Sequence, residues 1–304
     1  MKKRILSLLL ALPLALDACG AANEGELNGG ELLSKVTQTN MNNALLEKYD
    51  SVSYDCNWYN EDGSWEMHSV DAITKDKIFY RTDEIVGEGL YEEGSLAEQT
   101  MSAYTSGTAP YQWVFPERDD FISTYQSKLE SLVLMVVPEE KIESVTEEDS
   151  ITTLVTSITK EVSEAQFGDA SPEMRNGDRL CTEYRFDPET LEIQGMKMFL
   201  WREDGTKTVL SEGKMFYNVA PPKAPQTYKD AFDSAETVTL TLVFDPDTDS
   251  ERTQTFEVTK GVATGVSRPE EYISMFADWE CTQAYAQEGF MPEEDMTLYF
   301  VAGK

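Results

Sequence analysis

The chain has 304 residues and carries 25 basic against 56 acidic side chains, a formal net charge of -31 at neutral pH. A surface this acidic repels phosphate backbones and anionic lipid headgroups, which excludes nucleic-acid binding. Hydrophobic residues make up 40% of the sequence, enough to bury cores, and the length suggests two domains.

The first residues have the layout of a secretory leader. Three positive charges in residues 1–4 precede an apolar run over residues 5–16, which is too short to cross a bilayer as a permanent helix. We therefore predict that residues 1–18 are a signal peptide. The following stretch is rich in Gly, Ala and Asn without periodicity, so residues 19–30 are predicted to be a flexible tether.

The end of this leader resembles a bacterial lipobox. Leu16 and Ala18 precede Cys19, the residue that receives lipid in this pattern, although Asp17 stands where a small uncharged residue is usual. The prediction is a cell-envelope lipoprotein whose acylated Cys19 anchors it to the outer face of the membrane. The alternative is ordinary cleavage a few residues later, which would discard this cysteine.

The first part of the mature chain predicts a helix followed by an antiparallel meander. Residues 31–49 carry apolar side chains close to helical spacing. Residues 51–59 alternate apolar and polar, as in a strand with one buried face, and residues 60–63 are typical of a hairpin turn. Strands are predicted to continue over residues 64–74 and 77–82.

The middle of the chain has weaker patterns. Residues 87–116 are rich in Gly, Ser and Thr and predict no particular element. Residues 119–137 begin with two aspartates and have apolar side chains at helical spacing, which indicates a helix. A β-branched strand is predicted over residues 151–162 and a short helical turn over residues 163–169.

A second meander follows, and then a break. Strands are predicted over residues 179–186, 191–201 and 206–219, joined by turns that contain Asp-Pro and Asp-Gly. Three prolines within residues 221–225 interrupt regular structure. We therefore place a domain boundary in a linker over residues 221–235.

The leading helix, the curved meander and the closing "YRFDPETLEI…DGTKTVLSEGKMFYNV" resemble the bacterial lipoprotein-carrier superfamily over residues 31–220. The resemblance implies an α+β fold in which a curved antiparallel β half-barrel is closed on its concave side by helices. It also implies an apolar groove for an acyl chain or an extended lipoprotein segment. The candidates to line that groove are Met196, Met198, Phe199, Trp201, Met215 and Phe216. The alternative for these side chains is ordinary core packing.

Residues 238–301 resemble the β-grasp B-repeat of internalins and other bacterial surface proteins. The resemblance is carried by the strand over residues 238–244, the turn at Gly261, Trp279 in "FADWEC" and the closing strand "EEDMTLYF", although the repeat's terminal tryptophan is absent. It implies a small C-terminal β-grasp domain over residues 236–304, with a buried Trp279. In the family this domain is a spacer or adhesive module.

Cysteine and histidine usage does not favour a metal site. After Cys19, three cysteines remain, so not all can pair internally. A Cys56–Cys181 disulfide is one alternative and reduced, buried thiols are the other. No Cys-x-x-Cys occurs and His68 is the only histidine. The acidic stretch at residues 245–251 is predicted to be a solvated hairpin turn, with weak calcium binding as the alternative.

The sequence therefore predicts a lipid-anchored envelope protein that binds or scaffolds and has neither catalytic residues nor a cofactor. No nucleophile elbow, phosphate loop or zinc-protease motif is present. Its expected partners are the membrane, through the lipid on Cys19, and a hydrophobic ligand or an envelope protein. Two alternatives stay open: a lipid or lipoprotein carrier, and a glycan-acting surface enzyme, because so many acidic residues produce carboxylate pairs by chance.

Overall fold

The computed structural model describes residues 29–302, apart from 85–87, 106, 135–136, 138–139, 234, 270–271, 282–283 and 286–288. The predicted signal peptide, Cys19 and most of the tether lie outside the described residues. Within them the chain is α+β, with sixteen strands and five α-helices. None of the described helices is long and apolar enough to cross a membrane.

The helices differ from the predicted ones in length and continuity. The predicted helix over residues 31–49 is two helices, because the Asn40 side chain donates back to the Val36 carbonyl at 2.8 Å and the chain turns there. The helix predicted over residues 119–137 ends at Glu130 and has non-helical backbone angles at Tyr125. The helices are α1 (Gly29–Thr39), α2 (Asn42–Lys48), α3 (Arg118–Glu130), α4 (Lys160–Phe167) and α5 (Gln226–Phe232).

The strands form two sheets. The larger has the order β14-β6-β5-β4-β3-β2-β1-β11-β10-β9-β8-β7, and the smaller has the order β13-β12-β16-β15. Most neighbours are antiparallel, whereas β14 pairs with β6, and β12 with β16, in parallel. The strands are β1 (Ser51–Tyr59), β2 (Trp65–Thr74), β3 (Lys77–Glu84), β4 (Glu88–Ser95), β5 (Thr100–Thr105), β6 (Tyr111–Val114), β7 (Lys141–Glu148), β8 (Ile151–Thr159), β9 (Arg179–Phe186), β10 (Ile193–Trp201), β11 (Lys207–Tyr217), β12 (Thr237–Phe244), β13 (Arg252–Thr259), β14 (Ala263–Val266), β15 (Tyr272–Phe276) and β16 (Met296–Ala302).

Both predicted meanders are present, but six strands were missed: β4, β5, β6, β7, β14 and β15. The stretch over residues 87–116 contains β4, β5 and β6, whose glycines and short lengths hide the alternation. Strand β7 was missed because it has no buried face: its residues are exposed apart from the half-buried Ile142 and Glu143. The strand predicted over residues 151–162 stops at Thr159, where α4 begins.

The chain divides into two compact units, each made of two segments. The first unit comprises the residues up to Lys75 together with Gln126–Pro221, and the second comprises Asp76–Tyr125 together with Pro222–Lys304. The predicted linker thus starts where the chain passes between units. That residues 236–304 fold on their own stays a prediction.

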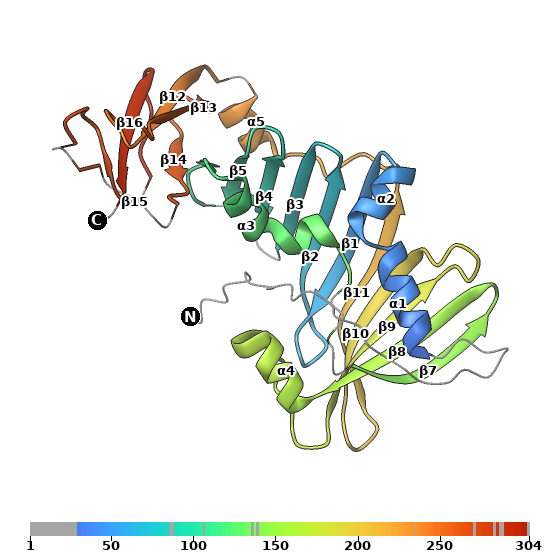
Figure 1. Ribbon diagram of the computed structural model, residues 1–304. Helices are drawn as coiled ribbons and strands as arrows, with labels where there is room; N and C mark the ends of the chain where they lie inside the picture. The colour runs from blue at the N-terminus through green and yellow to red at the C-terminus, as the bar shows by residue number, and fades with distance from the viewer. Residues whose placement is uncertain are drawn as a thin grey trace. The chain divides into compact units, whose positions relative to one another are not determined.

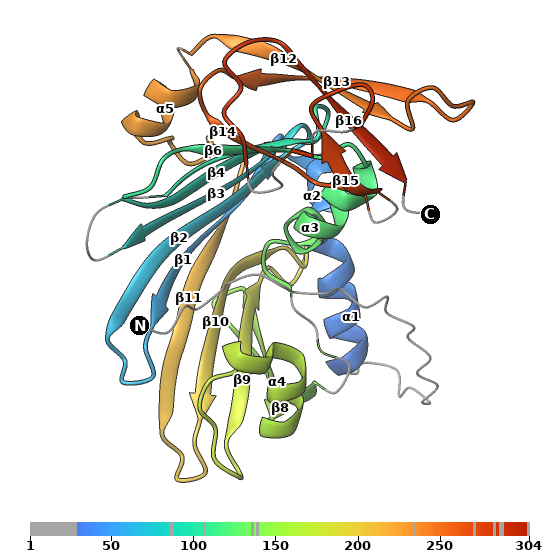
Figure 2. The same cartoon turned by 90° about the vertical axis from the view of Figure 1, so that its left-hand side faces the viewer.

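In the first unit a curved sheet carries helices on one face (Figures 1 and 2). Helix α1 contacts β7 and α2 contacts β1. The Asn42 side chain donates to the Lys128 carbonyl at 2.6 Å, and the Lys128 ammonium lies 3.7 Å from the Asp71 carboxylate of β2. The C-terminal part of α3 therefore lies on the same face as α2. We call this side of the sheet the covered face.

The second unit joins the C-terminal sheet to the β3–β6 strands through its core. Val114 of β6 packs in the same hydrophobic cluster as Leu240, Phe244 and Phe300. The buried Gln112 amide of β6 donates to the Thr259 carbonyl at 3.0 Å, and its oxygen accepts from the Thr259 amide at 3.0 Å. A buried side chain that satisfies backbone groups this way fixes the position of β13 relative to β6.

The prediction of a buried Trp279 is wrong. Its side chain is 45% exposed and makes an edge-on contact with the Tyr299 ring, with centroids 5.8 Å apart. Strand order explains the difference, because Leu240, Phe244 and Phe300 already fill the inner side of the small sheet.

Candidate binding face of the first unit

The covered face is built by strand alternation. Side chains on neighbouring strands that share a register position point the same way. The register places Met196 of β10 between Tyr184 of β9 and Gly213 of β11, and it places Met215 opposite Tyr54 of β1. A Cβ at Gly213 would lie 2.5 Å from the Tyr54 ring, so only glycine allows that ring to lie against β11.

A small cavity lies on the covered face, with a volume of about 30 Å³. A cavity needs roughly 10–15 Å³ to hold one water molecule, so there is room for about two. The residues that line it are Trp58, Val133, Val137, Glu140, Ile158, Phe167, Leu180, Thr182, Tyr184, Met196, Met198 and Ser211. The lining is mostly apolar.

Polar atoms face this apolar cavity. Among the lining residues, the Oε2 atom of Glu140 is buried and lacks a hydrogen-bond partner within the described residues, and the buried Ser211 hydroxyl interacts with the Cys56 thiol. The other carboxylate oxygen of Glu140 accepts from the Thr156 hydroxyl at 2.6 Å. Burial raises the pKa of Glu140, and the hydrogen bond from Thr156 lowers it. Burial is the larger effect, so the pKa of Glu140 is about 7. The site is therefore suited to bind water or another small hydrogen-bond donor.

Three of the six predicted groove residues lie on the covered face. Met196 and Met198 line the cavity, and Met215 lies further along β11 on the same side. The sequence did not point to Glu140 or Ser211 as cavity groups. A lone acidic residue after a proline and an ordinary strand serine carry no pattern that distinguishes them.

The other three candidates point to the opposite face, so they do not line this cavity; Phe216 and Met215 instead both line a second, more open pocket of about 450 Å³. Residues next to each other in a strand point to opposite sides, which separates Phe199 and Trp201 from the methionines, and Phe216 from Met215. The Lys207 ammonium lies 4.2 Å from the Trp201 ring centre and 5.0 Å from that of Phe199. Phe216 is 40% exposed.

Cys56 and Cys181 are both free and buried. Two strands, β11 and β10, separate β1 from β9. Three strand spacings of roughly 4.8 Å put about 14 Å between these chains, whereas the Cα atoms of a disulfide lie within about 7 Å. The predicted disulfide alternative is therefore wrong. Burial raises the pKa of each thiol to about 11, so both are protonated at neutral pH.

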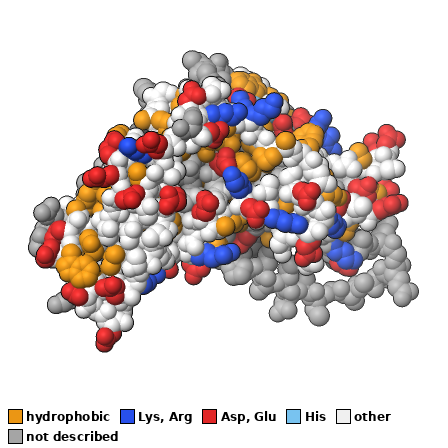
Figure 3. All heavy atoms as spheres, turned by 90° about the horizontal axis from the view of Figure 1, so that it is seen from above, with side chains coloured by type: hydrophobic (Ala, Val, Ile, Leu, Met, Phe, Trp, Pro, Cys, Tyr) orange, Lys and Arg blue, Asp and Glu red, His pale blue; other side chains and the backbone are white. Residues whose placement is uncertain are grey.

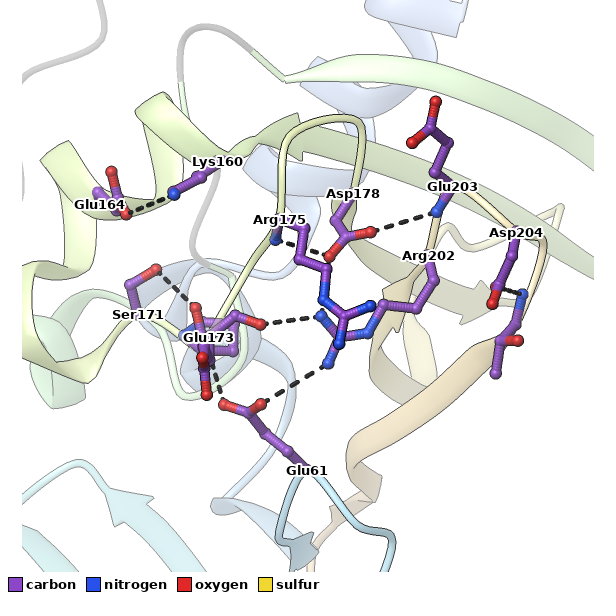
Figure 4. A network of polar contacts seen from close by, with 12 residues as sticks. Glu61, Lys160, Glu164, Ser171, Glu173, Arg175, Asp178, Arg202, Glu203 and Asp204 are labelled. Atoms are coloured by element: carbon purple, nitrogen blue, oxygen red, sulfur yellow. Dashed lines mark hydrogen bonds and ion pairs between the residues drawn. The ribbon is translucent and has the colours of Figure 1, made fainter.

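A polar network joins three connections at one end of the first unit (Figure 4). The Arg202 guanidinium donates to the buried Asp178 carboxylate at 2.8 Å and to the Glu173 carbonyl at 2.9 Å, and lies 3.7 Å from the Glu61 carboxylate. The backbone amide of Arg175 and the Arg202 guanidinium lower the pKa of Asp178. The network ties the β1–β2, α4–β9 and β10–β11 connections together.

The remaining candidates for chemistry have structural roles. The His68 ring lies 2.8 Å from Asp55 on the face opposite the cavity. In the acidic turn at residues 245–251, the Asp247 amide donates to Glu251 and the Tyr272 hydroxyl donates to Asp245. In the part of the chain that the structure describes, no group of three or more His, Cys, Asp or Glu side chains is placed to hold a metal ion.

Charged side chains of both signs are interspersed with hydrophobic ones on the surface in Figure 3. Ion pairs occur on the face of the sheet opposite the cavity, where the Lys197 ammonium lies 3.1 Å from Glu212. Such exposed pairs contribute little to stability. This pattern is that of a solvated surface.

No protein-family model matches the chain, and no curated protein sequence matches it. Distant structural similarity is found to MucB. The MucA/MucB complex of Pseudomonas aeruginosa aligns with a TM-score of 0.29 and 12% identity over 66% of this chain and 62% of that chain. MucB alone aligns with a TM-score of 0.29 and 12% identity over 64% of this chain and 60% of that chain. MucB in complex with MucA(peri) aligns with a TM-score of 0.28 and 11% identity over 82% of this chain and 69% of that chain. The chain thus covers less than two thirds of the first two of these structures.

Proposed function

We propose that this protein is a lipid-anchored, non-enzymatic scaffold of the cell envelope, which binds a partner on its surface and does not carry a lipid inside. The observation that carries this proposal is the volume of the cavity on the covered face, about 30 Å³. Ligand pockets generally measure roughly 300–1,000 Å³. We propose that side chains fill the space beneath the covered face, which leaves the open pocket of about 450 Å³ beside Met215 and Phe216 as surface where a partner could bind.

Tight packing also argues against the carrier alternative. Leu200, Leu210 and Met174 are buried in a cluster with Ile158 and Val137, on the side where an acyl chain would have to lie. Protein interiors pack like organic crystals, so an inserted chain would have to displace several of these side chains. A carrier needs an interior that fills and empties at little cost.

The arrangement of polar groups favours binding over catalysis. Glycoside hydrolysis needs two carboxylates flanking a cleft, whereas Glu140 is the one carboxylate among the residues that line the cavity. Its nearest polar partner is the Thr156 hydroxyl. Among the described residues of the cavity lining, Glu140 has no second carboxylate to act with it, which argues against a hydrolase.

The C-terminal sheet supports an accessory role. Its order β13-β12-β16-β15, with an antiparallel hairpin and a central parallel pair, agrees with a β-grasp module. Lipid on Cys19 would hold both units at the membrane surface. We propose that this module is a spacer or a partner-contacting element, as in the resemblance to B-repeats.

A fluorescent fatty-acid titration tests the scaffold against the carrier. The full chain, Met198→Glu and the matched control Lys197→Glu would be titrated, because residue 198 faces the cavity and residue 197 faces away. We expect no saturable binding to any of the three. Saturable binding that is weakened in folded Met198→Glu but kept in Lys197→Glu would refute the scaffold and favour the carrier.

A further inference from the structure

We infer that the free edge of β7 binds an extended, basic segment of a partner protein by adding it as a further strand to the sheet. The inference rests on the proposed function, since it names the chemistry of the partner. It begins from the sheet order, in which β7 is the last strand and β8 is its one neighbour within the described residues.

The β7 edge is long and exposed. Its residues 144–148 are all exposed, and Val145, a large apolar residue, is 45% exposed. An edge strand of this kind presents a row of unpaired amide and carbonyl groups, which is the template that β-strand addition uses.

The turn at the end of β7 sets which backbone groups point outward. Asp149 and Ser150 have φ angles of 49° and 64°, as in a two-residue type I′ hairpin turn. In such a hairpin the flanking pair, Glu148 and Ile151, exchanges both hydrogen bonds, and the pattern then alternates along the strand. The amide and carbonyl groups of Glu147 and Val145 therefore point to the free edge.

A register shift limits the length of the partner strand. The regular pairing of β7 with β8 is interrupted between Ile142 and Ser144, which leaves Glu143 as a bulge. The Glu143 carboxylate is occupied by the Arg179 guanidinium at 2.7 Å and the Ser157 hydroxyl at 2.6 Å. The regular edge available to a partner is thus residues 144–148.

Charge decides the kind of partner. Glu147, Glu148 and Asp149 are exposed and have no ion-pair partner in the described part of the chain. A second copy of this chain would place its acidic edge against this one, and like charges directly opposite destabilise strand pairing. The acidic edge thus rejects self-association and attracts a segment rich in Lys or Arg.

The test uses a synthetic probe, a fluorescein-labelled nonapeptide of alternating lysine and threonine, with the full chain purified in detergent. We expect saturable binding in fluorescence anisotropy that weakens as salt is raised. Two control peptides separate the contributions: one has glutamate in place of lysine, and one has N-methylated amides that cannot donate to a strand. Neither should bind.

Variants of residue 145 test the edge itself. Val145→Pro removes an outward amide without removing a hydrogen bond to β8, which is the position where an edge strand tolerates proline. We expect it to weaken peptide binding by about five- to tenfold, the effect of losing one hydrogen bond with its alignment. Val145→Thr keeps the amide and the strand preference, and should bind as the parent does.

The charge variant makes the test independent of whether Val145→Pro folds. Glu147→Lys with Glu148→Lys should abolish binding of the basic peptide and create binding of the glutamate peptide. Equal binding of the N-methylated peptide, or no binding of any peptide to the parent chain, would overturn the inference. The fatty-acid titration is a separate readout, so failure of the proposed scaffold can be told from failure of this edge.

Discussion

Buried Glu140 makes a sharp prediction about how stability depends on pH. Desolvation on the covered face raises its pKa from an ordinary 4.5 to about 7. The group is therefore easier to protonate in the folded chain than in the unfolded chain. Its contribution favours the folded state fully below about pH 4.5 and is lost as the pH rises through about 7.

The magnitude follows from the two pKa values. One pKa unit corresponds to about 1.4 kcal/mol, so the change between pH 4.5 and pH 8 reaches at most roughly 3 kcal/mol. Glu140→Gln keeps the shape and an oxygen that can accept from Thr156, and it removes the charge. We expect the variant to match the parent within about 1 kcal/mol at pH 5 and to be more stable by roughly 2–3 kcal/mol at pH 8.

Urea unfolding measures this difference. Tryptophan fluorescence would be followed at pH 5, 6, 7 and 8, because Trp58 lines the same cavity as Glu140. The matched control is Glu147→Gln, on exposed β7, which should leave the pH dependence of the parent unchanged. If Glu140→Gln and the parent lose stability in parallel from pH 5 to pH 8, the carboxyl is not desolvated and the account of the covered face fails.

Three further outcomes are expected. Cys19→Ala should move the protein from the detergent phase to the aqueous phase in a Triton X-114 partition, and unchanged partition would contradict lipidation. Gln112→Ala should lower the unfolding free energy by about 2–4 kcal/mol in urea, since it leaves buried backbone groups of Thr259 unpaired. Trp279→Ala should change stability by less than about 1 kcal/mol, because the side chain is 45% exposed; a loss above 3 kcal/mol would restore the prediction of a buried core residue.

Local patterns predicted the regular part of the fold well. The alternation in residues 51–59 and the Asp-Gly turn that follows correspond to β1 and the β1–β2 hairpin. The strands near residues 179–186, 191–201 and 206–219 are present with similar bounds. These segments were predictable because one face of each strand is buried, so that apolar and polar residues alternate along the sequence.

The candidate site was predicted less well, and the reason is geometric. The six groove candidates were chosen as large apolar residues of one meander, yet neighbours such as Met198 and Phe199 cannot share a face. Strand β7 was missed because an exposed edge has no hydrophobic period. The Glu140 carboxyl lies beside Tyr184, 44 positions further along the chain, and no local pattern links them.

The sequence by itself determined the net acidic charge, the α+β composition and the order of the two meanders, since each depends on composition or on neighbours within a few residues. Tertiary structure alone decided whether the covered face is open or filled, which side chains meet there, and which strand is left at the edge. Those properties depend on packing between strands that are distant along the chain. A difference of one register position or one methyl group changes such packing without altering any local pattern.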